Sequence, residues 1–365
     1  MKKQLISISI VLASASALMF TSCSKDPEKT TTPTPIVGSS GFYVLNEGGF
    51  GKKNASVSYY DKSSKSIVKD IYKNANGKDL GDQAQSMYIY QDKAYIVVQN
   101  SYKVEVVSVS GFKSTTPSVL DLGSSTASPR YFIAINDKTG YLTDWESNSV
   151  LVIDLATSKK TSSIAVGTGP DELVKIGKYV YVLNGGGYGS DNKVSVINTE
   201  NNTLAQTINT GDAPNTLAVD KDNNLWVLCG GKYKADFSGL ETKGKLVKIN
   251  TAANAVAQTL EFGSASDRPG NLIINGTSDM MYYEYRGKIF AQGIAATALD
   301  TAAHVLKRSF YALAYDPSDN YIIGCDAGDF KGDGKIVRYK IESSKVVSTV
   351  DSMVVGVIPN GVILK

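Results

Sequence analysis

Histidine, tryptophan and cysteine are scarce in this sequence of 365 residues, which contains one, two and three of them. The single histidine, His304, lies in a segment typical of an outer strand. Neither a zinc site with several histidines nor a Ser-His-Asp triad is therefore expected. Cys229 and Cys325 end apolar runs in separate parts of the chain, which favours two buried thiols over a disulfide.

The sequence also lacks a large excess of positive or negative charge, and it lacks long helical patterns. The chain has 38 Lys and Arg against 35 Asp and Glu, a formal net charge of +3, so composition gives no electrostatic basis for binding nucleic acid. After residue 40, short runs of Val, Ile, Tyr and Leu alternate with Gly, Asn, Asp and Pro, and long amphipathic helices are nearly absent. The pattern predicts an all-β domain over residues 41–365.

The first residues of the chain differ from the rest. Lys2 and Lys3 precede a short apolar stretch over residues 5–20 that contains several serines. Such a stretch, followed by polar residues, is typical of a secretory signal rather than a membrane span. We therefore expect a signal peptide over residues 1–22.

The segment that follows predicts a lipid anchor. LMFTSC (18–23) resembles the lipobox of bacterial lipoproteins, which implies lipidation of Cys23 and attachment to a membrane. SKDPE (24–28) resembles a short acidic signal for export to the surface of the outer membrane. An incidental cysteine and a solvated linker are the alternative interpretations. Residues 23–40 as a whole are expected to be a lipidated, flexible tether.

A pattern of strand, Asx-rich turn, strand and Gly/Pro turn recurs about seven times, at a spacing of roughly 40 to 55 residues that is typical of propeller blades. The clearest copy consists of YVYVLN (179–184), KVSVIN (193–198), residues 204–208 and the turn TGDAP (210–214). Asp and Asn bond their own backbone in such turns, and Gly tolerates a positive φ, so the chain reverses within a few residues. The repeat predicts blades of four strands.

The apolar runs after the Gly/Pro turns are predicted to be the innermost strands: 87–90, 132–135, 173–176, 217–219, 272–274, 312–315 and 361–364. The first folded segment, 42–45, instead matches a second strand. We therefore expect the two ends of the chain to share one blade, which closes the ring and leaves no open sheet edge. Seven blades are predicted, with six or eight as the alternatives because some copies are degraded.

Four motifs carry a family resemblance. YVLNEG (43–48), SVSYYD (56–61), CDAGDF (325–330) and GKIVR (334–338) resemble the YncE-like seven-bladed propellers found as surface lipoproteins. Within that group, a resemblance to the BtuG-like corrinoid-capturing lipoproteins implies that this protein is non-enzymatic and binds cobalamin or another small-molecule nutrient. They also imply delivery of this ligand to a TonB-dependent outer-membrane transporter. Two tryptophans are too few for the tryptophan-rich blades of quinoprotein dehydrogenases.

Long loops are expected to gather on one face of the disc, because strands alternate in direction within each blade. They are residues 46–55, 99–103, 145–149, 184–192, 230–244, 284–288 and 326–334. Long loops cost entropy to order, so their concentration indicates a binding surface. Aromatic, amide and guanidinium groups in or beside them would suit a corrinoid's flat ring, amides and phosphate. The predicted ligand-binding residues are Asn46, Phe50, Tyr102, Arg130, Trp145, Asn184, Tyr188, Tyr233, Phe237, Arg268, Tyr285, Arg286 and Phe330.

Other functions fit the same residues. A glycan or a peptide would suit them equally well, as in a surface scaffold of a nutrient-uptake complex. Acidic residues near the loops also leave open a carboxylate-dependent lyase or hydrolase. Asp326, Asp329 and Asp333 match no calcium-binding loop pattern, and a solvent-exposed turn is the preferred interpretation. No cofactor is expected, and any single aromatic residue can instead fill space between blades.

Overall fold

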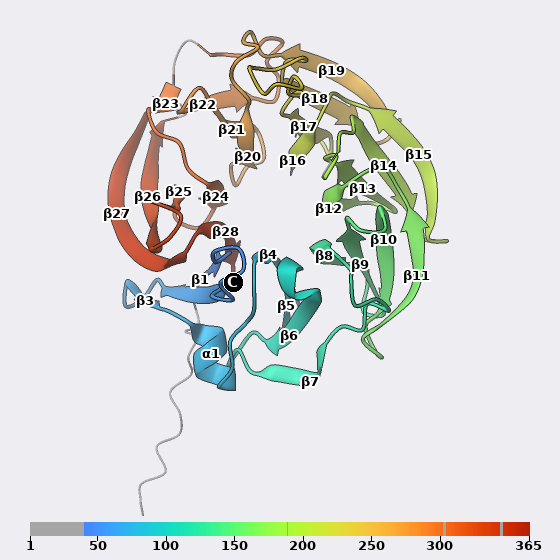
Figure 1. Ribbon diagram of the computed structural model, residues 1–365. Coiled ribbons are helices and arrows are strands. Elements are labelled where there is room, and N and C mark those ends of the chain that lie inside the picture. The colour runs from blue at the N-terminus through green and yellow to red at the C-terminus, as the bar shows by residue number, and fades with distance from the viewer. Residues whose placement is uncertain (1–39, 188, 302–303, 344–345) are drawn as a thin grey trace, which may run out of the picture. The chain divides into compact units, whose positions relative to one another are not determined.

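A computed structural model describes residues 40–187, 189–301, 304–343 and 346–365. The expected signal peptide, Cys23 and residues 24–39 of the expected tether lie outside these residues. The described chain forms seven four-stranded antiparallel sheets, arranged as the blades of a propeller around a central channel (Figure 1). The prediction of an all-β, seven-bladed propeller is confirmed.

The blades are numbered around the ring, and the strands of each are given from the channel outwards. Blade 1 contains β28 (Pro359–Leu364), β1 (Gly41–Asn46), β2 (Ser56–Asp61) and β3 (Ser66–Val68). Blade 2 contains β4 (Ala84–Tyr90), β5 (Lys93–Val98), β6 (Lys103–Ser108) and β7 (Ser114–Val119). Blade 3 contains β8 (Pro129–Ala134), β9 (Thr139–Asp144), β10 (Ser149–Asp154) and β11 (Lys159–Ala165). Blade 4 contains β12 (Pro170–Ile176), β13 (Tyr179–Asn184), β14 (Lys193–Asn198) and β15 (Thr203–Asn209).

The remaining blades follow the same order. Blade 5 contains β16 (Pro214–Val219), β17 (Leu225–Cys229), β18 (Lys245–Asn250) and β19 (Ala255–Glu261). Blade 6 contains β20 (Gly270–Ile274), β21 (Met280–Tyr285), β22 (Lys288–Gly293) and β23 (His304–Leu306). Blade 7 contains β24 (Ala312–Asp316), β25 (Tyr321–Asp326), β26 (Asp333–Ser343) and β27 (Val346–Val357). All seven predicted innermost strands are confirmed, and His304 lies in an outermost strand as expected.

The two ends of the chain meet in blade 1. The last strand, β28, pairs antiparallel with β1, so that Tyr43 lies opposite Ile363. The N–H of Lys365 also donates to the carbonyl oxygen of Gly41 over 3.3 Å. Because the last strand completes the sheet that the first begins, main-chain hydrogen bonds close the ring. The predicted closure is confirmed.

Apolar side chains fill the space between neighbouring blades. In β13 every residue except Tyr179 is buried, whereas in the outermost strand β15 only Ile208 is buried. A middle strand packs between two apolar layers, so its sequence is a continuous apolar run. Full burial of one such side chain contributes about 1.5–3 kcal/mol. Cys229 and Cys325 belong to these layers as free, buried thiols, as predicted.

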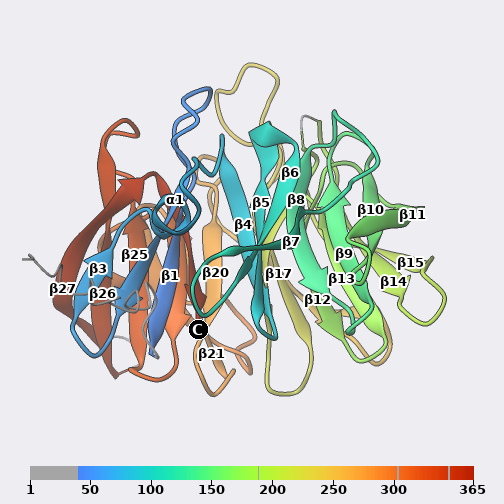
Figure 2. The same cartoon turned by 90° about the horizontal axis from the view of Figure 1, so that it is seen from below.

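The loops between second and third strands lie on one face of the disc, here called the loop face (Figure 2). Backbone hydrogen bonds fasten them to the turn that opens the same blade. The N–H of Trp145 donates to the carbonyl of Ser128, and the N–H of Gly185 to that of Gly169, each over 3.0 Å. The loop between β17 and β18 stands clear of the disc in Figure 2. The opposite face carries short turns and the start of β1.

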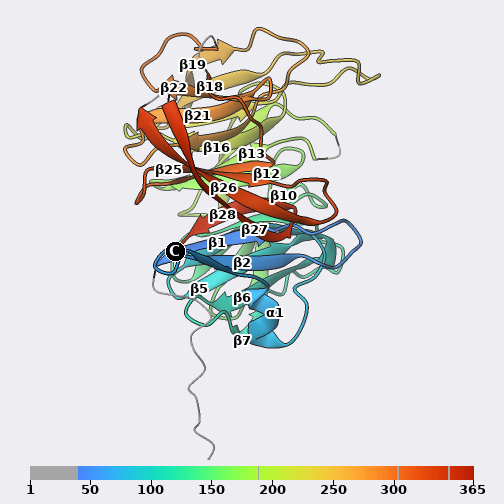
Figure 3. The same ribbon diagram turned by 90° about the vertical axis from the view of Figure 1, so that its left-hand side faces the viewer.

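Two short helices complete the described chain. The helix η1 (Gln99–Ser101) is part of the loop face, and α1 (Ile71–Asn76) connects blades 1 and 2 (Figure 3). Ile71, Tyr72 and Ala75 of α1 are buried in the core that these blades share. No amphipathic pattern predicted α1, because it is only six residues long. Neither described helix has the length and apolar character needed to span a membrane.

Candidate functional site

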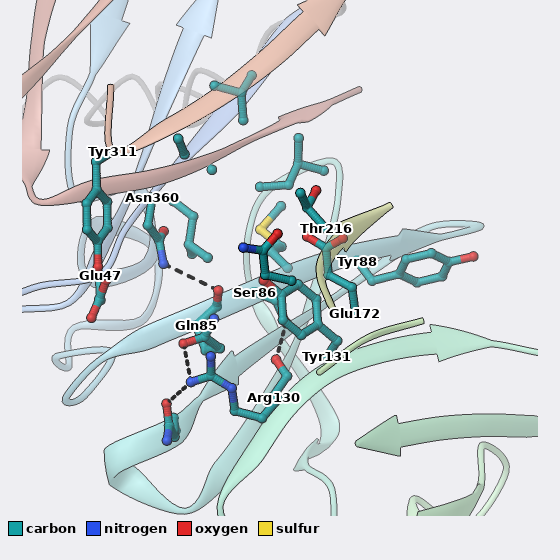
Figure 4. Close-up of a pocket in the computed structure, with 18 of the residues that line it drawn as sticks. Glu47, Gln85, Ser86, Tyr88, Arg130, Tyr131, Glu172, Thr216, Tyr311 and Asn360 are labelled. Atoms are coloured by element: carbon teal, nitrogen blue, oxygen red, sulfur yellow. Dashed lines mark hydrogen bonds between the residues drawn. The ribbon is translucent and has the colours of Figure 1, made fainter. Parts of the chain in front are cut away.

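The central channel opens towards the loop face in a cavity of about 950 Å³ (Figure 4). Residues of all seven innermost strands line it. The wall also includes side chains from outside these strands, among them Glu47 and Phe50 from the β1–β2 loop, Gln99 from η1 and Trp145 from the β9–β10 loop. The volume lies at the upper end of the range usual for small-molecule sites.

A ring of mostly polar side chains surrounds the mouth of this cavity, one at the start of each innermost strand or, in blade 7, directly before it. We call it the polar ring, and its members are Gln85, Arg130, Asp171, Asn215, Asn271, Tyr311 and Asn360. In every blade except blade 7, the strand pairing shifts register at this residue. Such bulges turn a side chain away from its regular direction. Apolar residues such as Leu173, Leu217 and Leu313 line the channel below the ring.

Arg130 is the most extensively bonded member of the polar ring. Its Nε lies 3.0 Å from Oδ1 of Asp171. Its Nη1 donates to Oε1 of Gln85 over 2.6 Å and also to Oε1 of Gln99. The guanidinium lies 3.9 Å from the ring of Trp145, a cation–π contact. Four contacts from blades 2, 3 and 4 therefore hold the guanidinium in one orientation beside the cavity.

Next to Arg130, the neighbouring carboxyl groups of Asp171 and Glu172 both have raised pKa values. Burial raises the pKa of Glu172 to about 8, and the nearby Asp171 carboxylate adds to this rise. The N–H of Leu217 donates to Oε2 of Glu172 over 3.1 Å, and this hydrogen bond partly offsets the rise in pKa. Burial also raises the pKa of Asp171, against the attraction of Arg130. At neutral pH Glu172 is therefore mostly protonated, and the charge of Arg130 is balanced by Asp171.

The blade 7 side of the mouth is built around Tyr311. Its hydroxyl donates to Oε2 of Glu47 over 2.8 Å, and Nε2 of Gln83 donates to the other carboxylate oxygen over 2.9 Å. Burial and the Glu47 carboxylate both raise the pKa of Tyr311, so the phenol keeps its proton. Phe330 packs edge-on against Tyr311 with ring centroids 5.5 Å apart. Figure 4 shows Glu47 and Tyr311 on the other side of the cavity from Glu172.

The long loop of blade 5 presents two aromatic rings. Tyr233 and Phe237 lie 6.0 Å apart between centroids, and the guanidinium of Arg268 lies 5.4 Å from the ring of Tyr233. Both rings are exposed. This group stands on the loop face without lining the cavity.

The structure places the other predicted ligand-binding residues outside the cavity wall. Asn46 and Asn184 are completely buried, and their amides bond backbone and serine groups of the adjacent strand. Tyr285 is buried in blade 6, and its hydroxyl accepts the N–H of Ser264 over 3.0 Å. Tyr102 and Arg286 are exposed on the loop face. Tyr188 lies outside the described residues. Of the predicted residues that the structure describes, Phe50, Arg130 and Trp145 alone line the cavity.

Most members of the polar ring were not predicted from the sequence. Gln85, Asn215, Asn271 and Asn360 were not singled out, although each is the polar residue that follows the turn into an innermost strand. Aligning the seven copies on that turn and reading the next position would have found them. The predicted site residues came from long loops instead, because loop length is easier to recognise in sequence than a bulge of one or two residues.

Asp326, Asp329 and Asp333, which match no calcium-binding loop pattern, each have partners within the protein. Asp326 pairs with Arg308 over 2.6 Å, and Asp333 pairs with Lys69 over 2.8 Å. Asp329 accepts backbone N–H groups of its own turn. Across the described ranges, no group of three or more His, Cys, Asp or Glu residues is arranged to hold a metal ion.

Comparisons with known proteins agree on the fold. A family model described as a domain of unknown function (DUF5074) matches residues 40–353. A quinoprotein alcohol dehydrogenase-like protein from Bacteroides thetaiotaomicron is similar, with a TM-score of 0.65 at 15% identity over 89% of this chain and 78% of that one. So is the periplasmic gluconolactonase PpgL from Pseudomonas aeruginosa, with a TM-score of 0.61 at 13% identity over 88% and 98%. At such identities the likeness shows the fold alone. No curated protein matches the chain.

Proposed function

The chain belongs to the family described as a domain of unknown function (DUF5074), and we propose that it is a non-enzymatic surface protein that binds a nutrient ligand at the mouth of its channel. The leading candidate ligand is a corrinoid such as cobalamin. The proposal includes the YncE-like and BtuG-like character implied by the sequence motifs.

The polar ring is the observation that carries this proposal. Its side-chain amides and the fixed guanidinium of Arg130 offer both donors and acceptors around an opening with an apolar floor. The charge of Arg130 is balanced by Asp171, Glu172 is mostly protonated at neutral pH, and the Glu47 carboxylate already accepts hydrogen bonds from Tyr311 and Gln83. Such a mouth favours a ligand whose polar groups are neutral amides or hydroxyls. A corrinoid carries several amides around a broad ring.

The proposed location follows from the N-terminal motifs. Lipidation of Cys23 would anchor the protein to the outer membrane, with residues 24–40 as a tether. Asn46 at one end of β1 lies at the loop face, so Gly41 at the other end lies at the opposite face. A tether joined there would leave the mouth open to a ligand and to the TonB-dependent transporter that is the proposed recipient.

Isothermal titration with cyanocobalamin tests the corrinoid proposal. We expect saturable binding of one ligand per protein, weakened at least tenfold by Arg130→Met, which alters the cavity wall. Arg286→Gln is the matched control, because Arg286 is exposed on the same face and pairs with Asp267 away from the cavity. No heat at micromolar protein would remove the corrinoid assignment.

A second candidate is a scaffold that binds a glycan or a peptide, which the exposed aromatic rings of the loop face favour, since such rings stack on sugars as well as on corrins. Binding on a glycan array without any corrinoid binding would support it. The raised pKa of Glu172 favours a third, less supported candidate, a lyase or hydrolase using this carboxyl group as an acid. That function would require turnover that Glu172→Gln abolishes.

A further inference from the structure

Several polar side chains at the mouth of the cavity use only one of their ends in hydrogen bonds within the protein. A side-chain amide has a donor end, the NH2 group, and an acceptor end, the carbonyl oxygen. A partner that can only donate, or only accept, fixes which end it meets. The remaining ends are available to a ligand, and their positions indicate which kind of polar group a ligand must bring to each side.

The donor ends lie on blades 2 and 3. The guanidinium of Arg130 can only donate, so Gln85 and Gln99 meet it with their carbonyl oxygens (Figure 4). This leaves the NH2 group of Gln85, next to Tyr131, as a further donor. Nε and Nη1 of Arg130 bond protein groups, but none of the described residues accepts a hydrogen bond from Nη2. Since Arg130 lines the cavity, Nη2 is a charged donor that the protein leaves unused there.

The acceptor ends lie on blades 6 and 1. Nδ2 of Asn271 donates to the carbonyl oxygen of Phe310 over 3.0 Å, and Nδ2 of Asn360 donates to that of Ala84 over 2.8 Å. Backbone carbonyls can only accept, so these contacts fix the orientation of both amides. Within the described chain, the side-chain oxygens of the two asparagines have no hydrogen-bond partner. Oδ1 of Asn360 is also buried, and it stays unpaired at a cost until a donor or a bridging water reaches it.

The carboxylate of Glu47 adds acceptors on the same side as these asparagines. It comes from the β1–β2 loop and accepts from Tyr311, which directly precedes β24 of blade 7. An ionised carboxylate offers about four acceptor positions, so its two hydrogen bonds with Tyr311 and Gln83 leave capacity for a ligand. We call Arg130 and Gln85 the donor side of the mouth, and Asn271, Asn360 and Glu47 the acceptor side.

We infer that the mouth binds its ligand in one orientation, with a hydrogen-bond acceptor of the ligand at the donor side and N–H or O–H groups of the ligand at the acceptor side. The inference rests on the proposed function and adds the class of polar group that the site selects. Carboxamides carry both kinds of group and satisfy both sides. Esters carry acceptors alone and leave the oxygens of the acceptor side unpaired, which a polar site rejects strongly.

Two corrinoids that differ in their donors test the inference by isothermal titration. Dicyanocobinamide carries amides around its corrin ring. Heptamethyl dicyanocobyrinate carries methyl esters there, so it keeps the carbonyl oxygens but has no N–H or O–H group. The wild type should bind the amide at least about tenfold more tightly than the ester, which corresponds to one or two hydrogen bonds.

Three variants assign this gap to the two sides of the mouth. Asn271→Gly removes one acceptor oxygen, and glycine tolerates the φ of 54° at this position. It should weaken the amide about fivefold and leave the ester unchanged, which narrows the gap. Arg130→Met should weaken both ligands by the same factor, because both keep acceptor oxygens. Asn223→Gly is the matched control: Asn223 has a φ of 60° in an exposed turn between β16 and β17, outside the cavity wall, and its loss should change neither affinity.

The outcomes separate this inference from the corrinoid assignment. Equal affinity of the wild type for the amide and the ester overturns the inference and leaves the proposed function standing. A gap that Asn271→Gly leaves unchanged overturns it as well, and so does an equal loss of both ligands in that variant, which would reflect altered folding. A gap that Arg130→Met narrows to the same extent would show that added space admits the ester, and would also overturn the inference. If the wild type binds neither ligand, the corrinoid assignment and the inference are both overturned.

Discussion

Replacing Arg130 with methionine should destabilise the protein in a pH-dependent way. Methionine keeps an apolar side chain over Trp145 but removes the ion pair with Asp171 and the hydrogen bonds to Gln85 and Gln99. Asp171 is then left without a cation, in a position where burial already raises its pKa. The consequence depends on whether Asp171 is charged.

The size of the effect follows from the burial of the pair. Removing one member of a buried ion pair costs about 3–5 kcal/mol. The side chains of Arg130 and Asp171 are 12% and 17% exposed, so partial screening by water reduces the cost to about 2–3 kcal/mol at pH 8. At pH 5 Asp171 of the variant can bind a proton, and a loss of about 1 kcal/mol remains from the hydrogen bonds. The direction of the pH dependence follows from the pKa of Asp171, which is higher in the folded than in the unfolded protein. The variant therefore retains more of its stability at low pH and loses it as the pH rises.

Differential scanning calorimetry of the wild type and Arg130→Met at the two pH values tests this. The Tm should fall by roughly 3–5 °C at pH 8 and by about half as much or less at pH 5. Asp171→Asn added to the variant removes the unpaired charge and should recover most of the loss at pH 8. An equal loss at both pH values, or no recovery in the double variant, would refute the reasoning.

Further predictions concern other buried groups. Glu172→Gln should raise the Tm at pH 9 and not at pH 5, because the raised pKa of Glu172 means that the wild type loses stability as pH rises towards 8; a Tm gain independent of pH would contradict this. Asn46→Ala should cost about 2–3 kcal/mol in urea unfolding, because it leaves buried groups unpaired, while ligand titration stays unchanged; weakened binding without lost stability would instead make Asn46 a ligand contact. Cys229 and Cys325, whose pKa values burial raises to about 12, should react with Ellman's reagent only after denaturation; reaction in the native protein would show local opening.

The blades could be recognised from sequence because their signals are local. A strand packed between two apolar layers, such as β13, is a continuous apolar run. The turns on either side contain Asp, Asn and Gly, because these residues favour the backbone conformations of tight turns. The match of the first segment to a second strand and of the last to an innermost strand predicted the closure between β1 and β28. The two short helices α1 and η1 were not predicted, since six and three residues of helix leave no periodic pattern.

Individual site residues were harder to assign. Asn46 and Asn184 end their strands with amides that would suit a ligand, but both are buried and bond the neighbouring strand. Tyr285 likewise ends strand β21, and it is buried between Phe262, which follows β19 of blade 5, and Phe290 of blade 6. The same residue type at the same local position can face a ligand or a neighbouring strand, and burial decides which.

The sequence by itself determined the repeat, the strand order, the face that carries the long loops and the joining of the chain ends, because strand and turn preferences act over a few residues. Only the tertiary structure decided which side chains meet at the channel. Gln85, Asn215 and Asn360 lie far apart in the chain, and one-residue bulges on separate blades bring them to one opening. The raised pKa of Glu172 has the same origin, since its surroundings come from neighbouring innermost strands. Such proximity depends on how the blades close around the axis, and no short stretch of sequence contains it.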